Sequence, residues 1–263
     1  MIKVGIIGGA GYTAGELLRI LINHPNVEIT SVVSKSHAGE AITKAHSDLI
    51  GDINLSFDED LNQNCDVVFV CSGHGKSKAV VESGVIPENC KIVDLSSDYR
   101  LKETGNDFVY GLPEINRADI KEAQKIANPG CFATCIELSL LPLAANNKLK
   151  NSVHISAITG STGAGQKPGA TTHFSWRNNN ASIYKAFTHQ HLGEITQSLK
   201  QLQGDFNEAI QFIPFRGAFA RGIFAACYTT FEGALEQAQE LYHNFYKTHP
   251  FVVISENPID VKQ

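Results

Sequence analysis

A cysteine at the expected start of a helix is the residue of this sequence best suited to chemistry. Cys131 directly follows an Asn-Pro-Gly run, which breaks regular structure, and a mostly apolar stretch from Cys131 to Ala145 predicts a helix. Helix N-termini stabilise anions, so a thiol at this place is expected to have a lowered pKa and to present a thiolate. Cys135, one turn later, is expected to be a packed side chain. The pattern alone leaves open the alternative that Cys131 is a structural residue without a catalytic role.

A glycine-rich segment near the N-terminus predicts a dinucleotide-binding turn. It has the spacing Gly8-x-x-Gly11-x-x-Ala14 and lies between a predicted strand, Lys3 to Ile7, and a predicted helix, Gly15 to Asn23. Glycine lets the backbone turn tightly and approach a pyrophosphate, which N–H groups and the helix dipole then hold. A plain glycine-rich turn is the alternative. The candidate cofactor-binding residues are Gly8, Gly11, Tyr12, Thr13, Ala14, Ser34, Lys35, Ser72 and Gly163.

The end of the second predicted strand, Val27 to Val33, indicates which nicotinamide nucleotide is bound. The strand is followed by Ser34-Lys35-Ser36, where an NAD-binding unit would carry an acidic residue for the ribose hydroxyls. A basic, hydroxylated tip suits a 2′-phosphate, so NADP is favoured over NAD. The alternative is that Lys35 is a solvated loop lysine.

The order of the predicted elements indicates two domains. In the first half, short apolar strands alternate with helices, as in an α/β Rossmann-type parallel sheet. Beyond Asn128 strands predominate, which predicts an α+β substrate and dimerisation domain. We therefore expect a dinucleotide-binding domain at 1–128 and a catalytic domain at 129–263. The further predicted strands are Asp66 to Cys71, Lys91 to Leu95, Lys125 to Ala127, Val153 to Thr159, Ala209 to Ile213, Gly222 to Phe231 and Phe251 to Ser255, and the further helices are Ser77 to Ser83, Glu194 to Leu202 and Ala234 to Lys247.

Composition narrows the class of protein. A net charge of −5 without a basic run argues against nucleic acid as a partner, since binding to phosphate backbones needs clustered Lys and Arg. No apolar run approaches the ~20 residues of a membrane span, and strand-like residues begin at Ile2, which predicts a cytoplasmic protein without a targeting peptide. The six cysteines show neither Cys-x-x-Cys pairs nor zinc-ligand spacing, so neither a metal site nor a disulfide framework is expected.

Several motifs, in order along the chain, resemble the N-acetyl-gamma-glutamyl-phosphate reductase family of the aspartate-semialdehyde-dehydrogenase-like superfamily. The resemblance extends from Met1 to about Ser255, and the second domain is then expected to be of the glyceraldehyde-3-phosphate-dehydrogenase C-terminal type. The motifs are Gly8 to Leu17, Ser97 to Arg100, Tyr110 to Glu114, Asn128 to Thr134, Thr159 to Gly165, His189 to His191 with Glu194-Ile195, and Arg221 to Ile223.

The resemblance implies an activity and a set of roles. Cys131 would attack an acyl phosphate and form a thioester, NADPH would supply hydride, and a histidine would act as general acid/base. His191 is the first candidate and His189 the second, because two residues apart on an extended segment they point the same way and spacing does not separate them. Glu194 would orient the acting imidazole, or would merely be a carboxylate at a helix start.

The implied substrate carries a carboxylate and a phosphate, so arginines are expected in its pocket. Arg100 and Arg221 are the main candidates and Arg216 a weaker one. The loop from Gly160 to Gly165 would offer N–H groups to phosphate or cofactor, or serve only as a connector. A homodimer or homotetramer is implied as well.

The sequence departs from the family pattern in places. Phe132-Ala133 stands where the family often has Tyr-Pro, and Gln190 and Leu192-Gly193 replace an Arg and a Thr-Pro. The family also implies some tens of residues beyond the point matched by Gln263, so a longer natural polypeptide is expected. Alternative functions are reduction of a succinylated glutamyl phosphate, aspartate-semialdehyde dehydrogenase activity, and non-catalytic nucleotide binding on the same fold.

Overall fold

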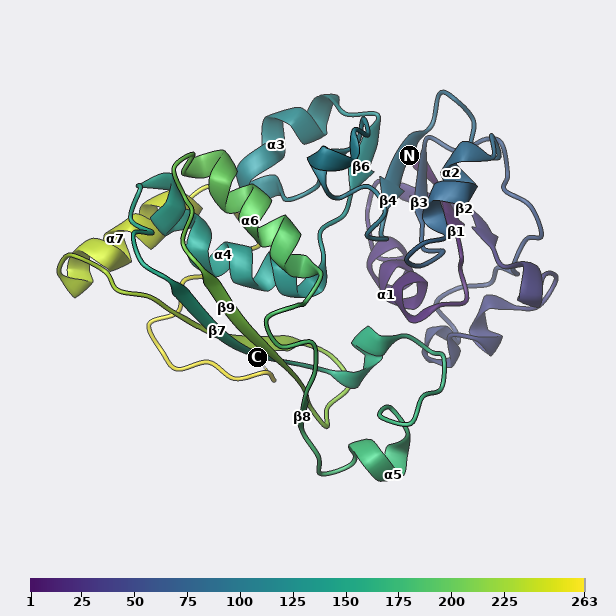
Figure 1. The fold of residues 1–263 in the computed structure, drawn as a ribbon. Coiled ribbons are helices and arrows are strands. Elements are labelled where there is room, and N and C mark those ends of the chain that lie inside the picture. Colours follow the sequence, from purple (N-terminus) through teal and green to yellow (C-terminus); the bar gives the residue numbers. More distant parts are fainter. Residues whose placement is uncertain (263) are drawn as a thin grey trace. The chain divides into compact units, whose positions relative to one another are not determined.

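The computed structural model describes residues 1–262, which form two compact units (Figure 1). The first unit is Met1–Pro129 and the second begins at Gly130. The expected boundary, between Asn128 and Pro129, lies one residue earlier.

The first unit contains a six-stranded parallel sheet, which confirms the predicted Rossmann-type fold. The strands occur in the order β2-β1-β3-β4-β6-β5. Their bounds are β1 Ile2–Ile7, β2 Val27–Val33, β3 Val67–Val70, β4 Lys91–Asp94, β5 Val109–Tyr110 and β6 Lys125–Ala127. The helices are α1 Tyr12–Leu21, α2 Ser77–Glu82 and α3 Pro113–Glu122.

Apolar side chains on both faces of this sheet explain why its strands read as continuous hydrophobic runs. Val4 and Ile6 of β1 pack in one core with Leu18 of α1. Ile7, which points to the opposite face, packs against a second core that contains Val68 and Val70. Alternate residues of one strand thus enter different cores, as in parallel sheets covered on both sides.

The sheet order creates a switch point between β1 and β3, because the chain runs from β1 to β2 and then returns to the other side of β1. Ligands of open α/β sheets bind beyond the carboxyl ends of strands at such a point. Gly8 follows β1 there with a φ of +86°, and a Cβ at Gly8 would lie 2.7 Å from Cys71 O. The glycine loop and the Cys71-Ser72 segment are therefore in direct contact.

The second unit is a four-stranded mixed sheet with helices on one face. The strand order is β10-β7-β9-β8, and β7 and β9 are parallel while the two outer pairs are antiparallel. Apolar residues of α4, α6, β7 and β9 form one core. The elements are α4 Cys131–Ala145, β7 Val153–Thr159, α5 Phe174–Arg177, β8 Ser182–Ile183, α6 His191–Leu202, β9 Ile210–Arg216, β10 Ile223–Tyr228 and α7 Leu235–Tyr246.

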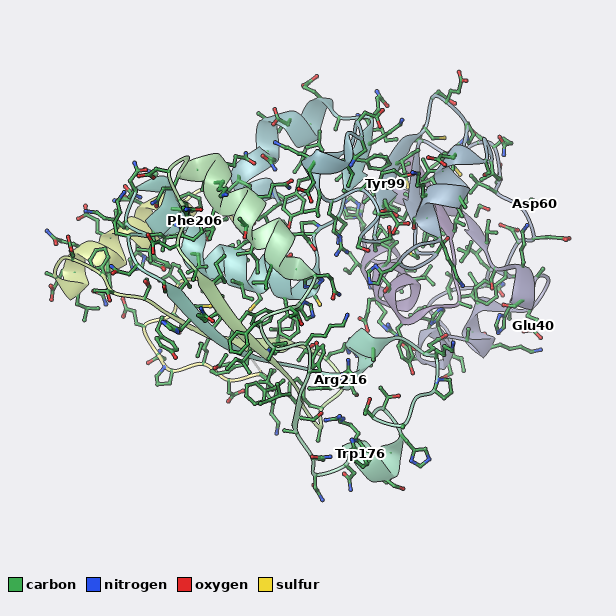
Figure 2. The ribbon with its side chains drawn as sticks, viewed as in Figure 1. Glu40, Asp60, Tyr99, Trp176, Phe206 and Arg216 are labelled. Atoms are coloured by element: carbon green, nitrogen blue, oxygen red, sulfur yellow. The ribbon has the colours of Figure 1, made fainter. Side chains whose placement is uncertain are left out.

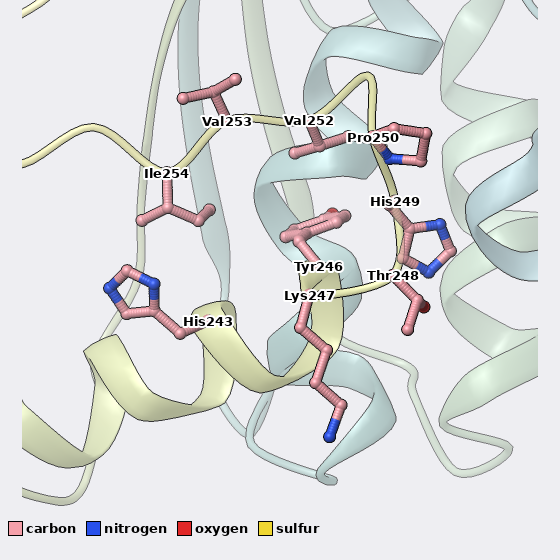
Figure 3. A pocket seen from close by; sticks show the side chains of 9 residues that line it. All are labelled: His243, Tyr246, Lys247, Thr248, His249, Pro250, Val252, Val253 and Ile254. Atoms are coloured by element: carbon pink, nitrogen blue, oxygen red, sulfur yellow. The ribbon is translucent and has the colours of Figure 1, made fainter.

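Some predicted elements were wrong or misplaced. Phe251 to Ser255 is not a strand and pairs with no described strand. Figure 3 shows the chain turning back after α7, so that Ile254 lies on the same side as His243 of that helix. The four apolar residues of this segment are consecutive, and Phe251 is 95% and Val253 84% exposed while Val252 and Ile254 are half-buried, so no core face selects a strand register. Helix α6 begins at His191, three residues before the predicted start.

None of the described helices is long and apolar enough to cross a lipid bilayer.

Candidate active site

Cys131 is the first residue of α4, preceded by Gly130 as the N-cap. It is exposed, whereas the other five cysteines are buried or half-buried, and all six are free thiols. Burial raises the pKa of Cys135 and of Cys227 to about 11, and that of Cys71 to about 12. These buried thiols are held neutral near neutral pH, and Cys131 is the cysteine that combines access to solvent with a helix N-terminus.

A buried carboxylate connects the Cys131 turn to a histidine. Glu194 Oε2 accepts the Gly130 N–H at 2.8 Å, and Glu194 Oε1 lies 3.9 Å from His191 Nε2. His191 and Glu194 are both on the first turn of α6. Their side chains face each other because residues three apart share a face of a helix. A Cβ at Gly130 would overlap the His191 ring, with Cδ2 at 2.7 Å. Glycine at position 130 therefore lets the imidazole lie directly against the backbone that precedes Cys131.

His189 has different surroundings, which distinguish it from His191. Its Nδ1 accepts the His191 N–H at 3.3 Å, so in the neutral ring Nε2 carries the hydrogen. The ring lies edge-on to Phe132 and Phe212 at 5.4 and 5.5 Å between centroids. Burial, and to a lesser degree the charge of Lys185, lowers the pKa of His189 to about 4. His189 therefore remains neutral at neutral pH and accepts protons poorly.

Tyr184 and Arg216 extend this cluster. The Tyr184 ring lies 5.7 Å from that of His189, and the Arg216 guanidinium carbon lies 4.7 Å above the Tyr184 ring. Burial raises the pKa of Tyr184. The positive charge of Arg216 lowers this pKa in part, and Cys131 raises it further. Among the described residues nothing accepts a hydrogen bond from the buried Arg216 Nε. A cation with an unused buried donor beside these groups is suited to an anionic substrate group.

Arg177 fixes the loop that precedes Tyr184 (Figure 2 labels its neighbour Trp176, and Arg216). The guanidinium is buried and donates to the main-chain oxygens of Thr171, Asn180 and Arg216, and to Ser182 Oγ at 3.0 Å. The contact with Arg216 O, at 2.7 Å, links this loop to the end of β9. Main-chain carbonyls thus surround a buried cation, which restrains the strand end that carries Arg216.

Arg100 lies in the first unit and is hydrogen-bonded to the main chain. Its guanidinium is buried and donates to Asn128 O at 2.9 Å and to Leu95 O at 3.1 Å. These bonds join the ends of β4 and β6, so Arg100 braces the loop that leads toward Cys131. Arg221 is exposed just before β10.

The loop from Gly160 to Gly165 already uses several of its N–H groups. Ser161 N donates to Phe219 O at 2.8 Å and Thr162 N to Ala220 O at 3.1 Å. A ligand cannot receive those two donors while the bonds persist. Gly163 lies within this turn, in the second unit, apart from the other candidate cofactor residues in the sequence.

The glycine loop in the first unit has the form that a pyrophosphate requires. Gly8 N and Gly9 N both donate to Val33 O, at 3.1 and 2.9 Å, and a Cβ at Gly9 would collide with Val32. A Cβ at Gly11 would meet only Gly8 O, at 3.7 Å, so the backbone is approachable there. Ala14 is fully buried, as expected of the small residue at which helix and strand pack closely. Tyr12 and Thr13 are exposed at the start of α1.

A hollow of about 290 Å³ lies at the same edge of the sheet. Its mostly apolar lining, together with Lys35, suits an adenine ring with a charged group at its ribose. It is lined by Ile7, Val33, Lys35, Glu59, Asp60, Leu61, Ala79, Val80, Ser83 and Val85 (Figure 2 labels Asp60). Ser34 Oγ and Ser36 Oγ contact His37 Nδ1 at 3.4 and 2.9 Å, which adds a second basic residue to the Lys35 turn.

Comparison with known proteins identifies the relationships of both units. Residues 3–123 match the family model of the semialdehyde dehydrogenase NAD binding domain, and residues 131–263 match that of the semialdehyde dehydrogenase dimerisation domain. The whole chain is 56% identical to N-acetyl-gamma-glutamyl-phosphate reductases of Flavobacterium johnsoniae and Bacteroides thetaiotaomicron, and covers 82% of each. The chain belongs to the N-acetyl-gamma-glutamyl-phosphate reductase family. As a member of it, the chain is an oxidoreductase with a domain for a nicotinamide nucleotide, which confirms the family and class predicted from the motifs.

Solved structures support the fold. The aspartate semialdehyde dehydrogenase of Candida albicans, solved with NADP, matches 92% of this chain and 75% of its own with a TM-score of 0.67 at 16% identity. The Vibrio cholerae aspartate semialdehyde dehydrogenase II gives a TM-score of 0.66 at 14% identity over 92% of this chain and 78% of its own. At 14–16% sequence identity, these two structures show that the fold is shared and nothing more.

Sequence reasoning missed three contributors to the site. Tyr184 carried no motif signal, although it lies five residues before His189. The acceptor role of Glu194 toward Gly130 spans 64 positions and is invisible to local patterns. Of the residues that line the hollow, the sequence analysis identified Lys35 but not Glu59, Asp60 or Leu61.

Proposed function

We propose that this chain reduces N-acetyl-gamma-glutamyl phosphate to N-acetylglutamate semialdehyde with NADPH and releases phosphate. The observation that carries the proposal is the exposed Cys131 thiol at the start of α4, next to the Glu194–His191 pair. Relatives 56% identical over the whole chain bear the corresponding name. The reaction serves the synthesis of arginine and ornithine.

Cys131 is the nucleophile in this proposal. Its sulfur attacks the acyl carbon, the bond from that carbon to the phosphate oxygen breaks, and phosphate leaves with the bonding electrons. The positive end of the helix dipole at the start of α4 favours the thiolate before attack. The product on the enzyme is a thioester. The nicotinamide nucleotide, when bound, supplies hydride to the same carbon.

His191 is the proton carrier. Hydride addition leaves a negative charge on the former thioester oxygen, and protonated His191 donates a proton to it as general acid. The neutral imidazole then takes that proton back as the C–S bond breaks, the aldehyde forms and Cys131 leaves as the thiolate. Glu194 then stabilises the imidazolium, since its Oε1 faces His191 Nε2. His189, kept neutral by a pKa of about 4, acts as a hydrogen-bonding neighbour.

Arg216 is our candidate for an anionic group of the substrate. Its guanidinium lies over Tyr184, and its buried Nε has no acceptor among residues 1–262. Arg221, exposed before β10, is the second candidate. Arg100 is a positioning residue for the Asn128 loop.

The reverse reaction tests the activity. NADPH formation is followed at 340 nm with N-acetylglutamate semialdehyde, NADP and phosphate or arsenate, in parallel with the N-succinyl analogue and with aspartate semialdehyde. We expect the acetylated substrate to give the highest kcat/KM. A preference for either of the other substrates would reassign the function within the same chemistry. Nucleotide binding without turnover and without labelling of Cys131 by iodoacetamide would favour a non-catalytic protein.

Lys35 is expected to select NADP. We predict that Lys35→Ala raises the KM for NADPH about tenfold and leaves the KM for NADH nearly unchanged, because a single charged contact to a 2′-phosphate is worth ~1.5–3 kcal/mol. Lys44→Ala is the matched control, since Lys44 is an exposed lysine of the same segment paired with Glu40 at 2.9 Å. Equal KM values for NADPH in wild type and Lys35→Ala would contradict the assignment.

The uncovered face of the four-stranded sheet is our candidate for association with a second copy of the chain. Tyr228 is 61% and Ile183 56% exposed there, and the His154 and Tyr228 rings stack across β7 and β10 at 5.2 Å. The matched family model describes residues 131–263 as a dimerisation domain. Exposed apolar sheet faces are uncommon on monomers, which supports an isologous dimer through this face.

Charge on this face should break the dimer. We predict that wild type sediments as a dimer in analytical ultracentrifugation and that Tyr228→Asp sediments at the 28.6 kDa monomer mass, because a buried unpaired carboxylate is costly in an interface. The control is Ile20→Asp on α1, an exposed apolar residue of the first unit. A Tyr228→Asp dimer of wild-type stability would rule this face out.

A further inference from the structure

We propose that His46 is a positioning residue for the cofactor-binding glycine loop, a role that rests on the proposed binding of a nicotinamide nucleotide. His46 is buried, and its Nε2 lies 2.8 Å from Gly9 O. A carbonyl oxygen only accepts, so His46 Nε2 carries the hydrogen and donates it. His46 belongs to the segment between β2 and β3, outside every motif discussed above.

The bond completes the restraint of one peptide unit in the loop. Gly9 N donates to Val33 O at 2.9 Å, and Gly9 O accepts from His46. The Gly9 α-carbon is also enclosed, since a Cβ there would collide with Val32 and lie 3.2 Å from Phe57. With Gly9 held from both sides, the following residues, Gly11 and Tyr12, start α1 in a defined direction.

The imidazole also determines how closely the segment approaches α1. A Cβ at Gly15 would lie 2.7 Å from His46 Nδ1 and 2.8 Å from its Cε1. Gly15 is therefore small because the ring packs against it. One turn later on the same helix face, Arg19 donates to both carboxylate oxygens of Asp48, at 2.5 and 2.8 Å. This pair raises the pKa of Arg19 and lowers that of Asp48, so both remain charged.

The segment that carries His46 begins at the Lys35 turn. Its base is closed by Gly39 N to Phe57 O and Phe57 N to Glu40 O, both at 2.8 Å (Glu40 is labelled in Figure 2). Ile42, fully buried, anchors it in the α1 core, and His46 N donates to Ile42 O at 3.0 Å. One continuous segment thus joins the residue expected at the 2′-phosphate to the loop expected at the pyrophosphate.

This arrangement predicts which part of the cofactor depends on His46. Gly9 belongs to the loop that meets the pyrophosphate, which NADPH and NADH share. Loss of the bond should weaken both nucleotides by the same factor, whereas loss of Lys35 should affect NADPH alone. A buried carbonyl left without a donor is costly, and we expect about a tenfold rise in each Kd.

The test is direct binding by the full chain, measured by the fluorescence of NADPH and of NADH, for His46→Ala, His46→Gln and the exposed control His24→Ala. Hydrogen exchange at Gly9 and Gly11 in the nucleotide-free protein is the second readout. We expect His46→Ala to weaken both nucleotides about tenfold with faster exchange, and His46→Gln to recover most of the affinity, because its Nε2 reaches a similar place. Should His46→Ala fail to fold, Asp48→Asn, which loosens the same segment from outside, is expected to give the same change in smaller measure.

Unchanged Kd values and unchanged exchange in a folded His46→Ala would overturn the proposal. Weakening of NADPH alone would also overturn it, since His46 would then act at the 2′-phosphate, and a His46→Gln variant no better than His46→Ala would exclude the hydrogen bond as the cause. Wild type that binds neither nucleotide would instead contradict the proposed cofactor, and the exchange experiment would still report on the loop.

Discussion

Cys131→Ser should lose turnover entirely while its Kd for NADP stays within about threefold of wild type. A serine hydroxyl ionises far less readily than a thiol near neutral pH, and no thioester can form on it. Cys131 belongs to the second unit, whereas the glycine loop and the Lys35 turn belong to the first. The measurement pairs steady-state kinetics of the reverse reaction with a nucleotide titration of the same preparation.

Cys135→Ser is the matched control, one turn further along α4. Burial raises the pKa of Cys135 to about 11, so it is a neutral packed thiol and its loss should cost some stability but little activity. Substantial residual turnover in pure Cys131→Ser would refute a covalent mechanism. An inactive Cys135→Ser beside an active Cys131→Ser would transfer the nucleophile to position 135.

His191→Asn should slow turnover by ~10²–10⁴, the usual contribution of a positioned acid/base. The variant keeps a polar side chain at the start of α6 but loses the group that exchanges protons beside Glu194. Glu194→Gln should give a smaller loss, because its amide oxygen can still accept the Gly130 N–H while the negative charge that stabilises the imidazolium is absent. kcat/KM measured across pH 5–9 is the readout.

The pH profile separates the two histidines. With a pKa of about 4, His189 stays neutral across this range, so any limb of the profile that a histidine causes belongs to His191 and should disappear in His191→Asn. His189→Asn should retain that limb and lose less activity. Identical profiles for wild type and His191→Asn would remove His191 from the acid/base role.

The sign of the stability effect of His189 is also fixed by its surroundings. Its pKa in the folded protein lies below the ordinary value of 6.5, so protonation favours the unfolded chain. Stability is therefore lost as the pH falls from about 6.5 toward 4, and is unaffected by this group above that window. Other groups titrate in the same window, and the contribution of His189 is the part that His189→Asn removes.

Local signals were sufficient for the first unit. The apolar run of β1, the glycines after it and the amphipathic helix that follows are each readable within a dozen residues, and the structure confirms the parallel sheet they predict. The position of Cys131 at a helix start was predicted for the same reason, because Pro129 and Gly130 end one element and an apolar run begins the next.

In the second unit, the prediction of secondary structure from residue type failed for one segment, whose conformation depends on whether its side chains are buried. Phe251 to Ser255 has the composition of a strand, yet it pairs with nothing described and its largest side chains are exposed. Strand propensity expresses fit to a half-buried pleated surface, and no such surface meets this segment.

By itself, the sequence determined the nucleotide-binding fold, the family and the location of a solvent-accessible thiol at a helix start, because these depend on contacts between near neighbours. Only the tertiary structure decided how the charged side chains are used. Arg100 was a main sequence candidate for the substrate and Arg216 a weaker one, yet Arg100 donates to two main-chain carbonyls while Arg216 has a buried Nε–H without an acceptor among the described residues. A long side chain has many rotamers, and which carbonyl, ring or carboxylate it meets depends on residues far away in the chain, as the 64 positions between Gly130 and Glu194 illustrate.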